Sequence, residues 1–357
     1  MTKEGERFLN LETRRYRAED LHQFGRQLVM AMGATEEEAQ IISDALLHGS
    51  LHGHPGQGQG YNKMPRMWQR IRAGAIRPGA DMIEVGAGPG WALLDAAGAS
   101  GIVAAARAMD RAIEIAEEAG VGSVFVRKSN HLGASGFHAL RAAKREMIGI
   151  CMTNAGAEMA PWGGITPVLG TNPWGIAVPS TGEFPLLLDI ALTQSGKGMV
   201  RWHQRDGLPI PTNWAYAPDG TETDDPELAL QGPLVPMGEH KGVGLSFMTD
   251  VLTGVLTGAA YGKDTYADPA NQNVGHFVMA IDPDRFIGRD AFYRRLADFC
   301  DQVKSSETRE GVEEVFLPGE LDHRNRSERL ANGVPVDLET VDALRELAEE
   351  LGVTFPL

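Results

Sequence analysis

Apolar residues spaced three and four positions apart predict helices towards both ends of the chain. Leu21, Phe24 and Leu28 form one apolar stripe, and Thr35 followed by Glu38 has the capping-box pattern that starts a second helix. The helices predicted near the ends are residues 18–47, read as two helices, then 65–74, 285–303 and 338–351.

The middle of the chain alternates short apolar runs with amphipathic stretches. Residues 82–97 read as a hairpin that turns at the glycines between 86 and 90, and Ser100 is placed to cap an alanine-rich helix that ends before Gly120. Strands are predicted at 124–126, 148–152, 176–178, 186–188 and 276–281, helices at 137–147 and 241–261, strand and turn through 161–200, and loops at 48–60 and 212–233. This alternation indicates a mixed α/β fold, and we expect the two helical ends to pack together beside the central α/β part.

Composition narrows the class of protein. The chain has 357 residues, a formal net charge of −15 and 23% charged residues, and no long Lys/Arg cluster, which argues against a nucleic-acid surface. The two cysteines, Cys151 and Cys300, indicate a reducing compartment rather than a disulfide scaffold. The first ten residues lack the apolar core of a signal peptide, and no apolar run is long enough to span a membrane. We therefore expect a cytoplasmic protein with no membrane partner.

Residues 129–136 carry the first candidate for chemistry. His131 follows the apolar run 124–126 and precedes a predicted helix, so it lies at the carboxyl end of a strand, where ligands gather in open α/β sheets. A histidine there could transfer a proton to a carbonyl oxygen that is being reduced. A histidine that only packs or caps the loop is the open alternative.

Two further positions have a pattern typical of cofactor contacts. Asp189 follows an apolar strand, where it could orient a histidine or bind a cofactor ribose; a local Asx-turn is the alternative. Lys241 stands between glycines at a helix start, where it could reach a cofactor phosphate or ribose; a solvated surface lysine is the alternative.

Three histidines, His48, His52 and His54, lie within seven residues and raise the possibility of a metal site. Gly49 and Gly53 argue against a continuous helix through them, and no Glu accompanies them as in zinc-protease helices. We therefore expect no resident metal, and a proton-relay role for one of these histidines is the preferred reading. The glycines between 86 and 90 do not fit a Rossmann fingerprint either, because a strand and not a helix follows them.

Eight short motifs, in order along the chain, together resemble the type-2 malate/L-lactate dehydrogenase family. The motifs are SNHLG (129–133), MTN (152–154), PWGG (161–164), LGTNP (169–173), LDIA (188–191), KGVGL (241–245), GHF (275–277) and PGE (318–320). The family includes ureidoglycolate, sulfolactate and diketogulonate oxidoreductases and reductases of cyclic imino acids.

The resemblance implies a non-Rossmann fold with a central mixed sheet, an NAD(P) cofactor and a homodimer. Since the ends are helical and the centre is mixed, we expect residues 1–85 and 285–357 to form a helix-rich substrate and dimerisation unit and residues 86–284 to form a central cofactor-binding α/β unit. The resemblance places His131 near the nicotinamide and the substrate. The cofactor-side candidates that it implies are Asp189, Ile190, Ala191, His240, Lys241, Pro318, Gly319 and Glu320.

The chain departs from the family pattern before Pro65. The family has Ser-His-Gly, two residues and then an Arg that grips a carboxylate. Here His52 follows Leu51, Ser50 stands one position further away, extra residues 54–62 intervene, and Lys63 takes the place of the Arg. A lysine binds a carboxylate as a single point charge, whereas an arginine can donate two parallel hydrogen bonds to it. The resemblance therefore predicts the cofactor chemistry of this chain better than it predicts the substrate.

We therefore expect an enzyme that moves hydride between NAD or NADP, with NAD placed first, and a small 2-oxo acid, 2-hydroxy acid or cyclic imino acid. The proton would come from His131, or from His52 relayed through Ser50 and Asp189. Lys63 would hold the substrate's anionic end, and Asn130 and Asn172 would support the pocket. A metal-dependent hydrolase or lyase that uses the three histidines, and a non-catalytic binding protein with the same fold, are the alternatives.

Overall fold

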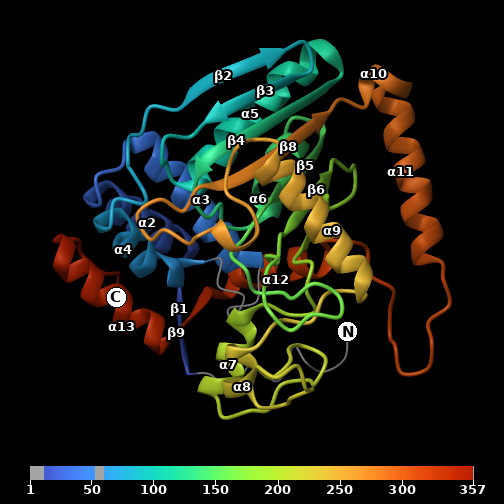
Figure 1. Cartoon of the computed structure of the whole chain (residues 1–357). Coiled ribbons are helices and arrows are strands. Elements are labelled where there is room, and N and C mark those ends of the chain that lie inside the picture. The colour runs from blue at the N-terminus through green and yellow to red at the C-terminus, as the bar shows by residue number, and fades with distance from the viewer. Residues whose placement is uncertain (1–11, 53–59, 357) are drawn as a thin grey trace.

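The computed structural model describes residues 12–52 and 60–356. Its centre is a seven-stranded mixed sheet with the strand order β2-β3-β4-β8-β5-β6-β7 (Figure 1). The strands of this sheet are β2 (Ile83–Gly88), β3 (Trp91–Asp95), β4 (Val121–Ser129), β5 (Ile148–Thr153), β6 (Trp174–Val178), β7 (Leu186–Ile190) and β8 (Val274–Ile281). Only β3 and β4 pair in parallel, so the predicted mixed sheet is confirmed.

Helices cover both faces of this sheet. The α-helices described are α2 (Ala18–Ala31), α3 (Glu36–His52), α4 (Met64–Arg72), α5 (Gly101–Ala119), α6 (Ser135–Ala143), α7 (Lys197–Arg205), α8 (Pro226–Gln231), α9 (His240–Asp250), α10 (Asp284–Ile287), α11 (Arg289–Lys304), α12 (Glu320–Asn332) and α13 (Leu338–Leu351). Shorter turns are η3 (Tyr61–Lys63), the π-helical η4 (Val251–Val255) and η5 (Gly262–Asp264).

Two glycines show how closely the layers approach. A Cβ on Gly122 of β4 would lie 2.1 Å from the Ala112 carbonyl oxygen of α5, and a Cβ on Gly275 of β8 would overlap the Thr253 carbonyl oxygen of η4. The helix α5 therefore presses on one face of the sheet and η4 on the other, and only glycine permits the contact at these two positions.

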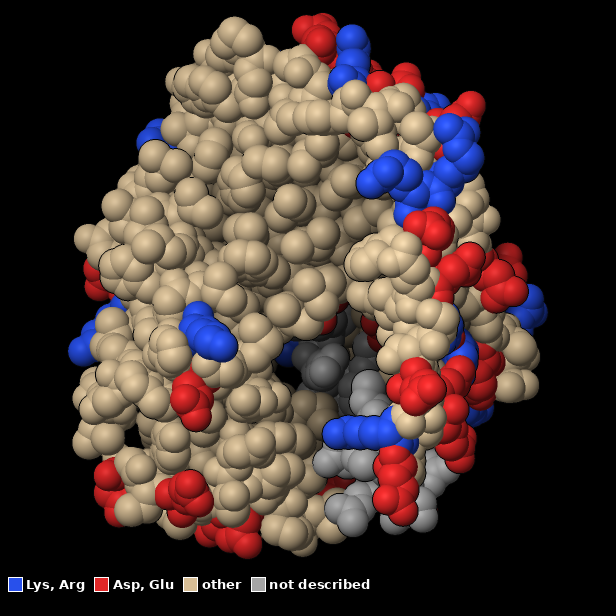
Figure 2. Space-filling view, turned by 90° about the vertical axis from the view of Figure 1, so that its right-hand side faces the viewer, with Lys and Arg blue, Asp and Glu red and all other residues tan. Residues whose placement is uncertain are grey.

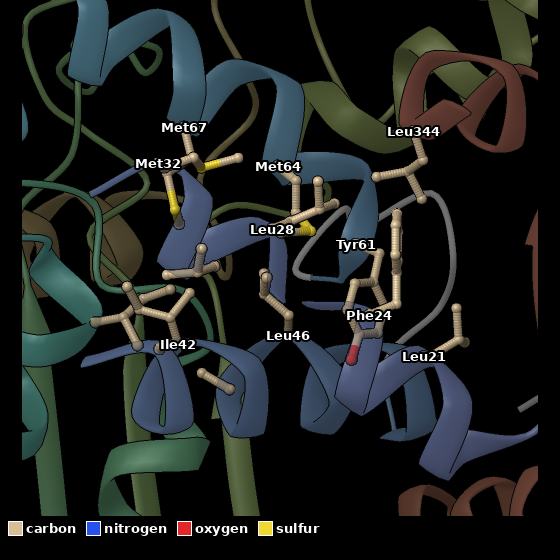
Figure 3. Close-up of a cluster of buried hydrophobic side chains, with 14 of the residues drawn as sticks. Leu21, Phe24, Leu28, Met32, Ile42, Leu46, Tyr61, Met64, Met67 and Leu344 are labelled. Atoms are coloured by element: carbon tan, nitrogen blue, oxygen red, sulfur yellow. The ribbon is translucent and has the colours of Figure 1, made fainter. Parts of the chain in front are cut away.

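The two ends of the chain share one hydrophobic core. Leu21, Leu28 and Leu46 from the N-terminal helices lie in the same buried cluster as Val334 and Leu344 from the C-terminal segment (Figure 3). The strands β1 (Thr13–Tyr16) and β9 (Val334–Asp337) add a two-stranded antiparallel sheet that joins the ends directly. The boundaries 85/86 and 284/285 of the proposed units stay a prediction.

Local signals in the sequence are confirmed at several positions. Thr35 and Glu38 form the reciprocal capping box, with hydrogen bonds of 3.1 and 3.2 Å. The predicted hairpin pairs Gly88 with Trp91, and Gly120 ends α5 in the left-handed conformation with φ 82°. Ser100 occupies the N-cap of α5, but its side chain makes no capping hydrogen bond.

Other expectations were wrong. The predicted loop from His48 is helix as far as His52, because Gly49 is buried in the packed face of α3 and tertiary contacts outweigh its low helix propensity. The predicted loop 212–233 contains α8, which Asp225 caps by accepting a 2.8 Å hydrogen bond from the Glu227 amide. The predicted helix 241–261 ends as η4, and Gly288, with φ 77°, divides the predicted helix 285–303 into α10 and α11.

Within residues 12–52 and 60–356, no helix combines the length and apolarity that crossing a membrane requires.

Candidate active site

The loop between β4 and α6 lies at the centre of the candidate site. His131 stands there, as predicted, and its Nδ1 accepts a 3.0 Å hydrogen bond from the Gly133 amide. Burial, with the charges of Lys63, Arg70 and Arg66, lowers the pKa of His131 to about 3. The ring is therefore neutral near pH 7, with its proton on Nε2, and can donate a hydrogen bond from that nitrogen.

Several cationic side chains lie within electrostatic range of this imidazole or of one another. Lys63 at the end of η3 is half-buried, and burial, with the charges of Arg66, Arg201 and Arg70, lowers its pKa to about 8. Glu158 lies near them, and burial raises the pKa of its carboxyl group above the usual value. Among the described residues, neither the Lys63 ammonium nor the Glu158 carboxylate has a hydrogen bond or ion pair. We call Lys63, Arg66, Arg70 and Arg201 the cation cluster.

Tyr266 contacts the cation cluster through Arg70. The guanidinium carbon of Arg70 lies 5.3 Å from the centroid of the Tyr266 ring, a cation–π distance. Tyr266 has φ 65°, a left-handed conformation that is strained for a bulky residue. Burial raises the pKa of Tyr266 to about 12, so its hydroxyl stays protonated near pH 7.

Of the residues in this region, His131 and Lys63 were predicted from the sequence. The residues that were not predicted are Arg66, Arg70, Arg201, Glu158 and Tyr266. The spacing of Lys63, Arg66 and Arg70 by three and four residues places them on one helical face, and that signal could have revealed part of the cluster. The sequence carries no comparable signal for Arg201, Glu158 or Tyr266.

Asp189 near the end of β7 links the sheet edge to the His131 loop. Its Oδ2 accepts a 2.9 Å hydrogen bond from the amide of Gly136, in the first turn of α6, so the carboxylate does not form a local Asx-turn. Although Asp189 is exposed at the edge of the sheet, partial desolvation by the surrounding protein raises the pKa of its carboxyl group, and the charge of Asp322 also raises it.

The predicted cofactor segments lie along β7. Near the start of this strand, the Leu187 amide donates a 3.1 Å hydrogen bond to the Pro318 carbonyl, and a Cβ on Gly319 would lie 2.9 Å from the Leu187 Cβ. Beyond its carboxyl end, the Met237 amide donates a 2.9 Å bond to the Leu192 carbonyl, which brings the segment before α9 against the chain that follows β7.

This assembly of segments fits a dinucleotide. Lys241 is exposed in the first turn of α9, and the preceding Glu239 has a left-handed φ of 60°. A cation beside a helix N-terminus suits a phosphate group. Ile190 and Ala191 are half-buried beside Asp189, and His240 lies with its ring 6.3 Å from Trp162. The Glu320 carboxylate is engaged by Lys304, by Arg324 and by the Leu317 amide, so only its backbone remains for a cofactor.

His52 ends α3, near α12. Its Nδ1 donates a 3.0 Å hydrogen bond to the His48 carbonyl oxygen, and the two imidazole rings stack with centroids 4.0 Å apart. Burial lowers the pKa of His52 to about 4, and Nε2 therefore carries a lone pair near pH 7. Ser50 accepts a 3.4 Å bond from the Tyr61 amide, and no hydrogen bond in the described structure joins His52 to Ser50 or to Asp189.

The metal hypothesis gains no support from the described residues. They contain no group of three His, Cys, Asp or Glu side chains placed to hold a metal ion. His48 and His52 stack on each other. His54, the third predicted ligand, lies outside the described residues.

Both predicted pocket asparagines are buried and use their amide groups within the protein. Asn130 Nδ2 donates to the carbonyl oxygens of Ala75, Gly98 and Ala99, at 2.9 to 3.2 Å. Asn172 Nδ2 donates to Ser246 and to a carboxylate oxygen of Asp250, at 2.9 to 3.0 Å. Both side chains hold the loops around the site, and a direct contact with substrate stays a prediction.

Comparison with known proteins gives a consistent result. Residues 16–345 match the family model described as malate/L-lactate dehydrogenase. A malate dehydrogenase of Pyrococcus abyssi is 36% identical, with 94% of each chain covered, and an L-sulfolactate dehydrogenase of Methanothermobacter thermautotrophicus is 35% identical, with 93% of this chain and 96% of the relative covered. The solved malate dehydrogenase of Pyrococcus horikoshii OT3 superposes with a TM-score of 0.89 at 31% identity, covering 97% of this chain and 98% of that one. The resemblance that the sequence motifs predicted is thus confirmed, and the chain belongs to the malate/L-lactate dehydrogenase family.

Proposed function

We propose that this protein is an NAD(P)-dependent dehydrogenase or reductase whose substrate is a small 2-oxo or 2-hydroxy acid with a second anionic group. This proposal rests on the cation cluster. Lys63 is half-buried with no partner among the described residues, and three arginines lie within electrostatic range of it or of His131. A half-buried ammonium that has neither a hydrogen bond nor an ion pair is stabilised when an anion binds beside it, and several cations favour a dianion over a monoanion.

Two relatives have names that agree with this substrate class, a malate dehydrogenase and an L-sulfolactate dehydrogenase. Malate and sulfolactate each carry two anionic groups. A third relative, a 2,3-diketo-L-gulonate reductase, is named for a monoanionic acid. A solved Δ1-piperideine-2-carboxylate reductase, at 26% identity with a TM-score of 0.83, acts on a monoanionic cyclic imine, which makes that imine a useful contrast.

The cofactor, held by the β7 end, Lys241 and the backbone at Gly319, would supply or accept the hydride when bound. The cation cluster would bind the substrate's anionic groups and fix the position of its C2 atom. His131 would donate its Nε2 hydrogen bond to the carbonyl oxygen, whose negative charge grows as it is reduced.

His52 suits proton transfer better than His131. For His131 to deliver a full proton it would have to be doubly protonated, but its Nδ1 already accepts the Gly133 hydrogen bond. His52 has Nδ1–H fixed on the His48 carbonyl, and no hydrogen bond within residues 12–52 and 60–356 engages its Nε2, so this nitrogen can accept a proton and return it. We therefore assign proton exchange to His52 and polarisation of the carbonyl to His131.

A substrate panel tests the proposal. Oxaloacetate, 3-sulfopyruvate, pyruvate and Δ1-piperideine-2-carboxylate would each be mixed with the enzyme and either NADH or NADPH, and the loss of reduced-nicotinamide absorbance followed. We expect kcat/KM to be highest for one of the two dianions, and the same panel decides between the two nucleotides. A higher kcat/KM for pyruvate or for the cyclic imine would contradict the substrate class.

We also propose that the protein forms a homodimer through the face that carries α9. Figure 2, which views the molecule from the side of α9 and α11, shows a broad surface with few charged side chains. The large apolar side chains exposed on α9, η4 and the residues after them are Leu245, Phe247, Met248, Val255, Leu256 and Tyr261. The helix α11 has no buried residue, and its Phe299 is also exposed. A second copy of the chain would cover this surface.

A further inference from the structure

The GHF motif contains a buried histidine that the proposed chemistry does not use. His276 lies on β8, the central strand of the sheet, opposite Val126 of β4 on one side and Thr153 of β5 on the other. Its side chain is 0% exposed. The ring therefore cannot contact solvent, and its two nitrogens must find partners inside the protein.

Both nitrogens have well-placed partners. His276 Nδ1 lies 2.8 Å from the Thr153 hydroxyl, and Nε2 lies 2.8 Å from the Ser129 hydroxyl. The Thr153 hydroxyl also lies 3.0 and 3.1 Å from the carbonyl oxygens of Asn154 and Gly275, to which it must donate. It therefore accepts from Nδ1–H, and the Ser129 hydroxyl donates to the bare Nε2.

These side-chain hydrogen bonds join the ends of β4 and β5 at a point where the backbone pairing of β4 with β8 is interrupted. The pairing of β4 with β8 is interrupted between Val126 and Ser129, and Lys128 within this break has a left-handed φ of 52°. The last residue of β4 is thus fixed to the sheet by its side chain as well as by its backbone.

The hydrogen bonds from His276 to Ser129 and Thr153, which we call the His276 clamp, hold the ends of β4 and β5, and both strands lead directly into the candidate active site. Asn130 and His131 follow Ser129, whereas Asn154 and then Glu158 follow Thr153. Asn154 continues the clamp, because its Nδ2 donates a 2.6 Å bond to the Ala260 carbonyl and its Oδ1 accepts a 2.9 Å bond from the Gly275 amide. A small shift of either strand end would move His131 relative to Glu158 and the cation cluster.

We propose that His276 is a positioning residue, which holds the His131 loop and the Glu158 loop at a fixed separation through Ser129 and Thr153. The inference rests on the proposed function for its kinetic readout. The histidine acts as a neutral, fully buried spacer with one donor and one acceptor, both directed to hydroxyl groups of the protein. Misplacing a reacting group by about 1 Å can cost on the order of 100-fold in rate.

Two single-hydroxyl variants test this role without removing the imidazole. Ser129→Ala frees the β4 end, and we expect it to lower kcat about tenfold while KM and the Kd for NAD(P)H stay within about twofold. Thr153→Val frees the β5 end, and we expect it mainly to raise the KM for the acid substrate. The Kd is measured by the fluorescence of the reduced nucleotide. We expect it to change little because β7 lies at the sheet edge, separated from β8 by β5 and β6.

Thr249→Val is the matched control. Thr249 is also fully buried, donates to the Leu245 carbonyl and accepts from the Trp174 indole, but it lies on α9. Its kcat and KM should match those of the unaltered protein even if its Tm falls as far as that of Thr153→Val. A third variant, His276→Gln, keeps one donor and one acceptor and should retain more activity than His276→Phe.

The inference would be overturned if Ser129→Ala and Thr153→Val lowered Tm but left both kcat and KM unchanged. It would also be overturned if all three hydroxyl variants lost activity in parallel with Tm. A failure of the proposed function looks different, because the unaltered protein would then turn over none of the four acids and imines in the panel.

Discussion

At the scale of single residues, Lys63 is the side chain whose loss should change the KM for an anionic substrate most directly. We expect Lys63→Met to raise the KM for the dianionic substrate about 10- to 100-fold, because a charge-assisted contact contributes about 1.5–3 kcal/mol. Lys263→Met is a control, since Lys263 is an exposed lysine outside the cation cluster. An unchanged KM in Lys63→Met would remove this residue from the substrate site.

The pKa of Lys63 predicts a pH dependence as well. Because that pKa is about 8, the ammonium loses its proton as the pH rises through this value. We expect KM to increase above about pH 8 in the unaltered protein and to stay level in Lys63→Arg, because arginine remains charged. Measurement of KM from pH 6.5 to 9.5 in both proteins decides the point, and identical profiles would contradict it.

The two candidate histidines should respond differently to the same substitution. Glutamine keeps an N–H donor, so His131→Gln should lower kcat only about tenfold if His131 merely donates a hydrogen bond. Glutamine cannot exchange a proton, and His52→Gln should therefore lower kcat by about 10² to 10⁴-fold. The reverse order of the two losses would assign proton exchange to His131. His22→Gln serves as a control, because His22 pairs with Asp44 and belongs to neither the His131 loop nor the cation cluster.

At the scale of elements, the N-terminus of α3 depends on one buried carboxylate. Glu38 is 3% exposed and accepts hydrogen bonds from the amides of Thr35 and Gly79. Replacing it with alanine leaves both amides without their acceptor, so we expect Glu38→Ala to lower the free energy of unfolding by about 2 kcal/mol. Urea unfolding measures this loss, with the exposed Glu36→Ala as control. A loss no larger than that of Glu36→Ala would contradict the role of the capping box.

Contacts between elements explain why some helices and strands were not predicted from the sequence. The helix α3 continues through Gly49 because that glycine is buried against the rest of the protein, a contact that helix propensity does not include. The strands β1 and β9 escaped prediction because they are short and each forms only by pairing with the other, more than 300 residues away along the chain.

At the scale of the whole molecule, buried neutral histidines predict acid sensitivity. Burial lowers the pKa of His138 to about 4 and that of His276 to about 3, and both side chains are 0% exposed. The unfolded chain binds these protons below about pH 6.5, whereas the native state does not until the pH reaches the lowered values. Stability present above pH 6.5 is therefore lost progressively as the pH falls through this window.

The size of this loss can be measured. At pH 5.5 each of the two histidines should cost about 1.4 kcal/mol of unfolding free energy relative to neutral pH. Urea unfolding at pH 7.5 and 5.5 gives the comparison, and His138→Phe should show a smaller pH effect if it folds. A stability that does not change between these pH values would contradict the assignment of neutral buried rings.

Dimerisation through the face that carries α9 is also a property of the whole molecule. We expect the unaltered protein to elute as a dimer in size-exclusion chromatography with light scattering, and the double substitution Phe247→Lys with Met248→Lys to elute as a monomer. Two charges placed on an apolar interface carry a large desolvation cost. Met30→Lys is the control, because Met30 is 47% exposed on α2 and not on the α9 face. A monomeric unaltered protein would contradict the proposal.

The sequence by itself determined the mixed α/β class, most strong helices and strands, and the family. Periodicity and capping are local, so Thr35–Glu38 and Gly120 could be recognised from their neighbours alone. It also determined that His131 would follow a strand and precede a helix, because that order is written along the chain.

Only the tertiary structure decided which groups face one another. It brought Arg201, Glu158 and Tyr266 to Lys63 and His131, it engaged the Glu320 carboxylate in ion pairs, and it placed His276 between two hydroxyls. The physical reason is that burial and charge depend on neighbours in space. The pKa values and protonated nitrogens that set the chemistry arise when distant segments of the chain meet.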